Sequence, residues 1–270
     1  MYHPDENWQS LEVAYDLVYG TRSGSKGPVS EGLLSWEWFS FYALRNHLYP
    51  FWLSLPSHLL KLLGIDTNFM VVNSMYFMHC ILWAFGDYFY FYLVKTIAGR
   101  RCAVITTTIS LTSQTVNRYI SRTSMNGIEG NLVIAALYYF TNLKPVKFDS
   151  GLSKMTLLIS ICFLARSSSL AAWIPLAIFK ILEDSNFFLP IVLAGLSVTI
   201  PAIGFSIALD SYYYGVLTIP QVNFVYVNVV ENASKFFGVD PWYFYIKGFQ
   251  EEFCDIYILG IFGLSLLTVR

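Results

Sequence analysis

The chain has 270 residues and a formal net charge of −1, and 55% of its residues are hydrophobic while only 13% are charged. An average globular domain carries about 25% charged residues, and a near-neutral balance offers no basic surface to a nucleic acid. These values exclude a soluble enzyme, a disordered protein and a nucleic-acid binder. They predict an all-α polytopic membrane protein, because an open sheet cannot cross a bilayer.

In chain order, the predicted segments are a loop, a helix bundle, a second loop and a final span. Residues 1–67 and 210–252 mix aromatic with polar residues, as luminal helices that lie in the membrane interface do. Residues 68–209 form the predicted transmembrane bundle, and residues 253–270 form the last transmembrane helix. A span needs about 20 apolar residues, and about seven apolar runs are present, two of them short: 68–94, 102–116, 128–143, 155–165, 170–181, 187–209 and 253–269.

Basic residues mark every second connection between these apolar runs. They lie at 95–101, 144–154, Lys180 and Arg270. The positive-inside rule assigns such connections to the cytosol and the remaining ones to the lumen or the outside. Asn232 begins the sequon Asn-Ala-Ser in one of the remaining connections, so we predict that it is glycosylated. The two signals agree on the orientation of a multi-pass protein.

An acidic pair, Asp5 and Glu6, is the first candidate for chemistry. Pro4 precedes the pair and biases His3 to an extended shape. One interpretation is a general base beside the membrane surface. The other is that the two acids open a helix, where the helix dipole favours negative charge.

Arginine residues gather in the predicted luminal connections, against the usual distribution of positive charge. Arg122 and Asn126 share one connection with Glu129, and Arg166 lies in another. A phosphate-bearing ligand would explain this arrangement, because arginine suits phosphate geometry. The alternative is a set of salt bridges with Glu129, Asp210 or Glu231.

Glu37 lies between Trp36 and Trp38 in the first loop. A carboxylate beside indole rings can bind sugar hydroxyls while a ring stacks on the sugar face. Anchoring of the tryptophans in the membrane interface explains the same string equally well. The four cysteines form no CxxC pair and the histidines show no metal spacing, so we predict no metal site.

One string in the first loop is specific. HPDENWQSLEVA at residues 3–14 resembles the first luminal loop of the GPI mannosyltransferase III family, within glycosyltransferase family 22. Further matches follow in the family's order and span nearly the whole chain. They are SWEW at 35–38, ALR at 43–45 with Pro50, RTSMN at 122–126 with Glu129, Ala165-Arg166, DSYYYG at 210–215, Asn223-Phe224, and PWYFY at 241–245.

The resemblance implies a dolichyl-phosphate-mannose-dependent α-mannosyltransferase with the type C membrane fold. Such an enzyme lies in the endoplasmic reticulum membrane and has a luminal active site. It would move mannose from dolichyl phosphate mannose to the 2-hydroxyl of the second mannose of a GPI-anchor precursor, with inversion. No cofactor is implied, and the partners are the lipid-linked donor, the GPI precursor glycolipid and membrane lipid, without nucleic acid.

The resemblance also implies roles for single residues. Asp5 is the predicted catalytic base, with Glu6 as the alternative base or as a partner that orients the acceptor. Arg122 and Arg166 would receive the charge of the departing phosphate. The residues that would bind or shape the substrate are His3, Trp36, Glu37, Arg45, Asn126, Glu129, Asp210 and Tyr214.

Other functions fit parts of the same pattern. A relative in the same family could act on the N-glycan precursor or add a fourth GPI mannose. A transporter should show internal repeats, and the sequence shows none. Because the family has a helix ahead of the first loop and more spans at the other end, we expect a partial type C fold cut at both ends. An inactive membrane fragment is therefore a further alternative.

Overall fold

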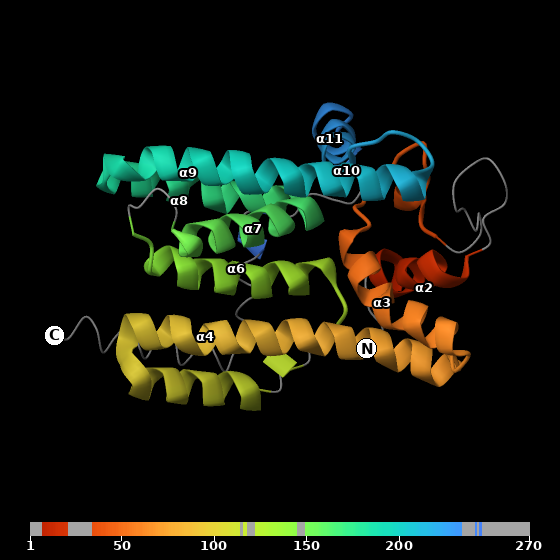
Figure 1. Ribbon diagram of the computed structural model, residues 1–270, viewed down its shortest axis with the longest axis horizontal. Coiled ribbons are helices and arrows are strands. Elements are labelled where there is room, and N and C mark those ends of the chain that lie inside the picture. Colours follow the sequence, from red (N-terminus) through yellow and green to blue (C-terminus); the bar gives the residue numbers. More distant parts are fainter. Residues whose placement is uncertain are drawn as a thin grey trace.

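The computed structural model describes residues 7–20, 34–113, 116–117, 122–144, 149–233, 241 and 243–244. Every regular element within these ranges is a helix, which confirms the predicted all-α class (Figure 1). The long helices lie side by side along the long axis of the molecule, and successive helices run in opposite directions (Figure 1). The connections between them therefore gather at two ends of one bundle.

The N-terminal elements form a layer at one of these ends. They are η1 (Asn7–Leu11), α2 (Glu12–Tyr19), η2 (Trp36–Trp38) and α3 (Leu48–Leu63). The ammonium group of Lys61 in α3 donates a 2.6 Å hydrogen bond to the backbone oxygen of Val18 and ties α3 to α2. Helices thus occur within the predicted first loop, while their position in a membrane interface stays a prediction.

α4 spans Asn68–Thr112 and consists of two limbs. Gly99 divides them with φ 85° and ψ 170°, a conformation open to glycine because it has no Cβ. The second limb folds back beside the first (Figure 1). This turn lies where the sequence predicts a basic connection at 95–101. The returning limb is only about 20 Å long at 1.5 Å per residue, short of the roughly 30 Å hydrocarbon layer.

α6 (Met125–Thr141) and α7 (Ser150–Ala165) form the centre of the bundle together with α4. Ala135 and Ala136 of α6 are completely buried. At Gly86, α4 approaches α6 so closely that an added Cβ would overlap the side-chain amide of Asn131. Small residues let two helix backbones approach in this way, so these positions determine the spacing of the two helices.

The remaining helices complete the bundle and carry the chain back across the first loop. In order they are η3 (Ser167–Ser169), α8 (Leu170–Glu183), η4 (Ser185–Phe187), α9 (Phe188–Ala194), η5 (Gly195–Thr199), α10 (Ile200–Tyr214), α11 (Pro220–Val225) and η6 (Tyr226–Val230). η4, α9, η5 and α10 follow one another without a break as one long helical segment. α10 ends at Gly215, which has a positive φ of 69°.

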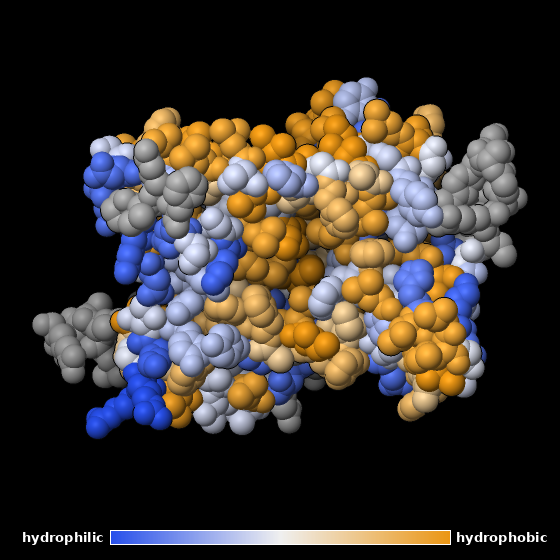
Figure 2. Space-filling model, viewed as in Figure 1, coloured by the Kyte–Doolittle hydropathy of each residue, from blue (hydrophilic) through white to orange (hydrophobic). Residues whose placement is uncertain are grey.

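Two described helical segments are long and apolar enough to cross a membrane, Asn68–Thr112 and Ser185–Tyr214. Ser150–Ala165 is a shorter apolar helix. Figure 2 shows apolar side chains over α9, η5 and α10, where Leu196, Ile200 and Phe205 are exposed. These features support a membrane protein. The count of seven spans and the predicted domain boundaries stay predictions, and the span at 253–269 lies outside the described residues.

Candidate functional site

A buried carboxylate, Asp210, joins α10 to the start of α3. Its Oδ1 accepts the backbone N–H of His47 at 2.8 Å and lies 2.9 Å from His47 Nδ1. Its Oδ2 accepts hydrogen bonds from Asn46 Nδ2 at 2.5 Å and from Ser206 Oγ at 3.2 Å. The side chain of Asp210 is completely buried. Since both oxygens are used, Asp210 fixes the backbone at 46–47 and does not itself face a cavity.

Arg45 precedes this anchored segment, and two contacts hold it. Its guanidinium forms a 2.8 Å ion pair with Glu37, and its backbone oxygen accepts a 2.6 Å hydrogen bond from Tyr214. Ala43, two residues earlier, has a positive φ of 43°, and Asn223 Nδ2 donates to its backbone oxygen at 3.3 Å. Arg45 Nε is buried and has no partner among the described residues. The guanidinium therefore keeps unused donors in a fixed position.

Arg45 lines a polar cavity of about 200 Å³. A second arginine, Arg166, reaches the same cavity from the end of α7 and forms a 2.9 Å ion pair with Glu129. The other polar residues of the lining are Gln9, Asn46, Asn126, Ser167 and Gln221. Two guanidinium groups and several amides around one small space suit an anion that also carries hydrogen-bonding oxygens. We call the part of the bundle around this cavity the site end.

A larger apolar cavity of about 650 Å³ lies next to the polar one. Leu164 and Ala165 line both cavities, so the two spaces are neighbours at the end of α7. The apolar walls come from α3, α4, α6, α7, η5 and α10, with Trp52, Leu82, Leu132, Ile161, Val198 and Phe205 among the lining residues. A polar space beside an apolar one suits a ligand with a charged head and a hydrocarbon chain.

The structure brings three of the sequence-predicted residues, Arg45, Asn126 and Arg166, to one cavity. Glu37 and Glu129 lie beside the two arginines as ion-pair partners, so the salt-bridge interpretation holds for Arg166. It does not exclude a ligand, because each guanidinium offers five donors.

Other predicted residues lie outside the lining. Trp36 is 38% exposed and meets Tyr42 edge to face, and Asn232 is exposed. Arg122 is half-buried, and Tyr214 contributes through the backbone of Arg45. His3, Asp5 and Glu6 lie outside the described residues.

Gln9, Asn46, Gln221 and Phe224 are among the lining residues that the sequence did not predict as site residues. Gln9 belongs to the string at residues 3–14, Asn46 directly follows Arg45, and Phe224 belongs to the Asn223-Phe224 match, so the motifs gave a signal for these three. Gln221 donates a 3.0 Å hydrogen bond to the backbone oxygen of Leu164 and holds α11 against the end of α7. No local pattern marks such a contact between distant segments. Among the described residues, no three His, Cys, Asp or Glu side chains gather as a metal site requires.

Comparisons with known proteins bear on the site. The model of the Alg9-like mannosyltransferase family matches residues 1–269. "Mannosyltransferase APTG1" from Arabidopsis thaliana is 28% identical over 92% of this chain and 44% of its own length. Human "GPI alpha-1,2-mannosyltransferase 3" is 28% identical over 90% of this chain and 42% of its own length. "GPI mannosyltransferase 3" from Trypanosoma brucei brucei is 30% identical over 90% of this chain and 47% of its own length.

The chain thus spans less than half the length of these curated relatives. No solved structure matches it significantly.

Proposed function

Because this chain belongs to the Alg9-like mannosyltransferase family, we propose that it acts in GPI-anchor synthesis as a mannosyltransferase. The donor is dolichyl phosphate mannose, and the acceptor is the second mannose of a GPI precursor in the endoplasmic reticulum membrane. The names of the relatives from human and Trypanosoma brucei brucei support GPI as the acceptor class, and the human one also names the α1,2 linkage.

One observation carries the proposal of a lipid-linked donor. The polar cavity with Arg45 and Arg166 lies beside the apolar cavity at Leu164 and Ala165. A mannosyl phosphate would lie in the polar part, where arginine side chains favour phosphate oxygens. The first part of the polyprenyl chain would extend along the apolar walls, because burial of hydrocarbon is favourable. A soluble nucleotide-sugar donor has no hydrocarbon chain that could occupy the apolar cavity.

The reaction needs one displacement at the anomeric carbon of mannose. The bond from this carbon to the phosphate oxygen breaks, and the electron pair leaves with the phosphate. A bond to the 2-hydroxyl oxygen of the acceptor forms on the opposite face, so the configuration inverts. Arg45 and Arg166 stabilise the negative charge that collects on the leaving phosphate, the role of a preorganised electrostatic site.

The acceptor hydroxyl must lose its proton during this displacement. Asp5 is our candidate base, with Glu6 as the alternative, and the carboxylate that takes the proton becomes a neutral acid. Gln9 lines the polar cavity and follows Glu6 by only three residues, a length of chain that spans at most about 11 Å.

The test is a transfer assay in membranes from cells that lack the third GPI mannosyltransferase. The membranes receive this chain, dolichyl phosphate mannose and a synthetic two-mannose GPI acceptor, and the three-mannose product is measured. Asp5→Asn should lower the rate by about 10²–10⁴-fold if Asp5 is the base. Glu12→Gln, which removes another acid of the first loop, is the matched control and should leave the rate unchanged.

Two results would contradict the proposal. Transfer to a synthetic N-glycan precursor in place of the GPI acceptor would move the chain to another branch of the family. A full rate with both Asp5→Asn and Glu6→Gln would remove the acidic pair from the mechanism.

A further inference from the structure

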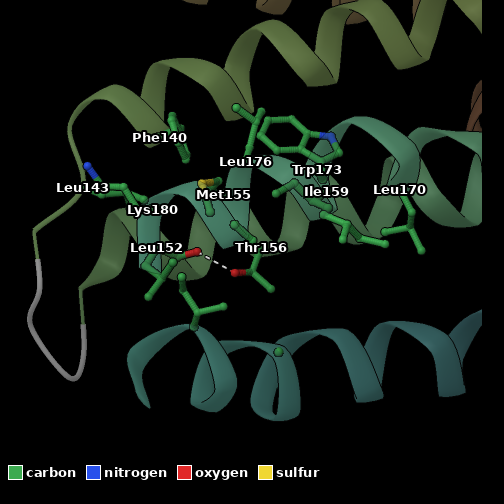
Figure 3. A pocket seen from close by; sticks show the side chains of 14 residues that line it. Phe140, Leu143, Leu152, Met155, Thr156, Ile159, Leu170, Trp173, Leu176 and Lys180 are labelled. Carbon is green, nitrogen blue, oxygen red and sulfur yellow. Dashed lines mark hydrogen bonds between the residues drawn. The ribbon is translucent and has the colours of Figure 1, made fainter. Parts of the chain in front are cut away.

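A second apolar cavity opens at the end of the bundle opposite the site end. It has a volume of about 200 Å³ and is enclosed by α6, α7, α8 and α9 together with the start of η5 (Figure 3). Phe140, Met155, Ile159, Trp173 and Leu176 are among its walls. It shares no lining residue with either cavity of the proposed donor site. Whatever binds here does not belong to the site described above.

One polar group of this cavity is left without a partner. Trp173 is 5% exposed, and its indole Nε1 has no hydrogen-bond partner among the described residues. Burying a donor of this kind without an acceptor is costly, so native proteins supply a partner in most cases. The Nε1 atom itself is closed off from the cavity, so the indole contributes only its ring to the apolar lining.

A lysine lies at the other edge of the same wall. Lys180 follows Trp173 by seven residues on α8, two helical turns or about 10 Å along the axis, and the two residues lie on the same face. Its ammonium group meets Glu183 at 2.7 Å and lies 5.8 Å from the ring centre of Phe140. An ammonium has three donors, so two are left for an anion. The cavity therefore has a cation at one edge and apolar walls deeper inside.

The surroundings of this cavity carry excess positive charge. We call this part of the bundle the basic end. Its described basic residues are Lys95, Arg100, Arg101, Lys144, Lys154 and Lys180, and its described acids are Asp149, Glu183 and Asp184. Figure 2 shows hydrophilic side chains gathered at this end, on the left of the view. Asp149 and Asp184 each accept a hydrogen bond from a backbone N–H at a helix start and are partly satisfied there. Clusters of this kind attract anionic lipid headgroups.

We propose that this cavity binds one acyl chain of an anionic glycerophospholipid. The headgroup phosphate lies at Lys180, and the acyl chain continues along Met155 and Ile159. The cavity has room for part of one chain and not for a whole lipid, so the headgroup stays at the surface. This places a structural lipid at the end of the bundle away from sugar transfer. The proposal does not depend on the proposed function.

The test uses photo-crosslinking in vesicles. The protein is reconstituted in phosphatidylcholine vesicles that contain a trace of phosphatidylserine with a diazirine in one acyl chain. After irradiation, labelled peptides are mapped by mass spectrometry. Labels should concentrate in α7 and α8 near Ile159 and Leu176. Excess phosphatidylserine should compete about fivefold better than excess phosphatidylcholine, the effect of one lysine near the headgroup.

Two tryptophan variants on one helix provide a matched comparison. Ile159→Trp fills this cavity and should reduce labelling about fivefold or more, because a close-packed cavity leaves no room for the chain. Ile161→Trp, two residues further on α7, points a ring of the same size into the other apolar cavity and should leave the labelling unchanged. Lys180→Ala should abolish the headgroup preference.

Three results would overturn the proposal. One is labelling spread evenly over the exposed apolar faces of the wild-type protein, a result that needs no variant to fold. The second is equal labelling of Ile159→Trp and Ile161→Trp. The third is competition by dolichyl phosphate as strong as that by phosphatidylserine, which would make this cavity part of the donor site. Loss of mannose transfer with normal labelling would contradict only the proposed function.

Discussion

The two ends of the bundle differ in how many of their basic side chains are paired with a carboxylate. At the site end, Arg45, Arg166 and His47 each meet a carboxylate within 2.9 Å. At the basic end, Lys180 pairs with Glu183 at 2.7 Å, but Lys144 and Lys154 are exposed and the basic residues outnumber the acids. Buried polar groups need partners and are fixed by them, whereas exposed charges are solvated and interact weakly. One end is therefore suited to position groups around a ligand, and the other to meet a charged surface.

The largest effect should come from breaking the buried centre of the site end. Asp210→Ala leaves the donors of Asn46, His47 and Ser206 without their acceptor, and should cost about 3 kcal/mol or more of folding free energy. Ser206→Ala removes one member of the same network and should cost about 1 kcal/mol. Thermal unfolding of the purified protein in detergent measures both. Equal unfolding temperatures for the two variants would show that Asp210 is not the centre.

The second prediction compares how much one arginine at each end contributes to mannose transfer. Arg166→Ala should lower mannose transfer about a hundredfold, because it removes a group that stabilises the charge on the leaving phosphate. Arg100→Ala removes an exposed arginine at the basic end and should leave the rate unchanged. The assay is transfer to the synthetic GPI acceptor at saturating donor. A similar loss in both variants would indicate a general effect of charge on the protein and not a local role.

A smaller effect concerns the helix contact between the two ends. Gly86→Ala places a Cβ against the Asn131 amide and should cost about 1–3 kcal/mol, the range of overpacked cores. Gly130→Ala, one position before Asn131 on α6, meets open space and should be neutral or slightly stabilising, because alanine favours helix. The thermal unfolding midpoints of the two variants measure these changes in stability. A stable Gly86→Ala protein would mean that α4 and α6 can separate without cost.

The sequence predicts the long helices well because each of them coincides with a run of apolar residues. The run at 68–94 and the basic connection at 95–101 anticipate the first limb of α4 and its turn at Gly99. The apolar run at 187–209 anticipates the continuous helix over Ser185–Tyr214. These features depend on residues near one another in the chain. Composition and periodicity are enough to find them.

The site is predicted only in part, because its contacts join distant residues. Asn46 and Asp210 are 164 positions apart, and no local pattern pairs them. The ion pair of Glu37 with Arg45 depends on a turn in which Ala43 has a positive φ, an uncommon conformation for a residue with a Cβ. The resemblance selected Arg45 and Arg166 as site residues, but only the fold brings them to one cavity.

The smallest effect separates the two ends by the strength of one ion pair at each. A double-mutant cycle on Glu37 and Arg45, whose side chains are 19% and 20% exposed, should give a coupling of about 1 kcal/mol. The same cycle on Lys180 and Glu183, where the carboxylate is 53% exposed, should give about 0.3 kcal/mol and fall further in high salt. Unfolding free energies of the wild type, single and double alanine variants supply both values. Equal coupling energies would mean that water screens the two ion pairs alike. The site end would then be no more preorganised than the basic end.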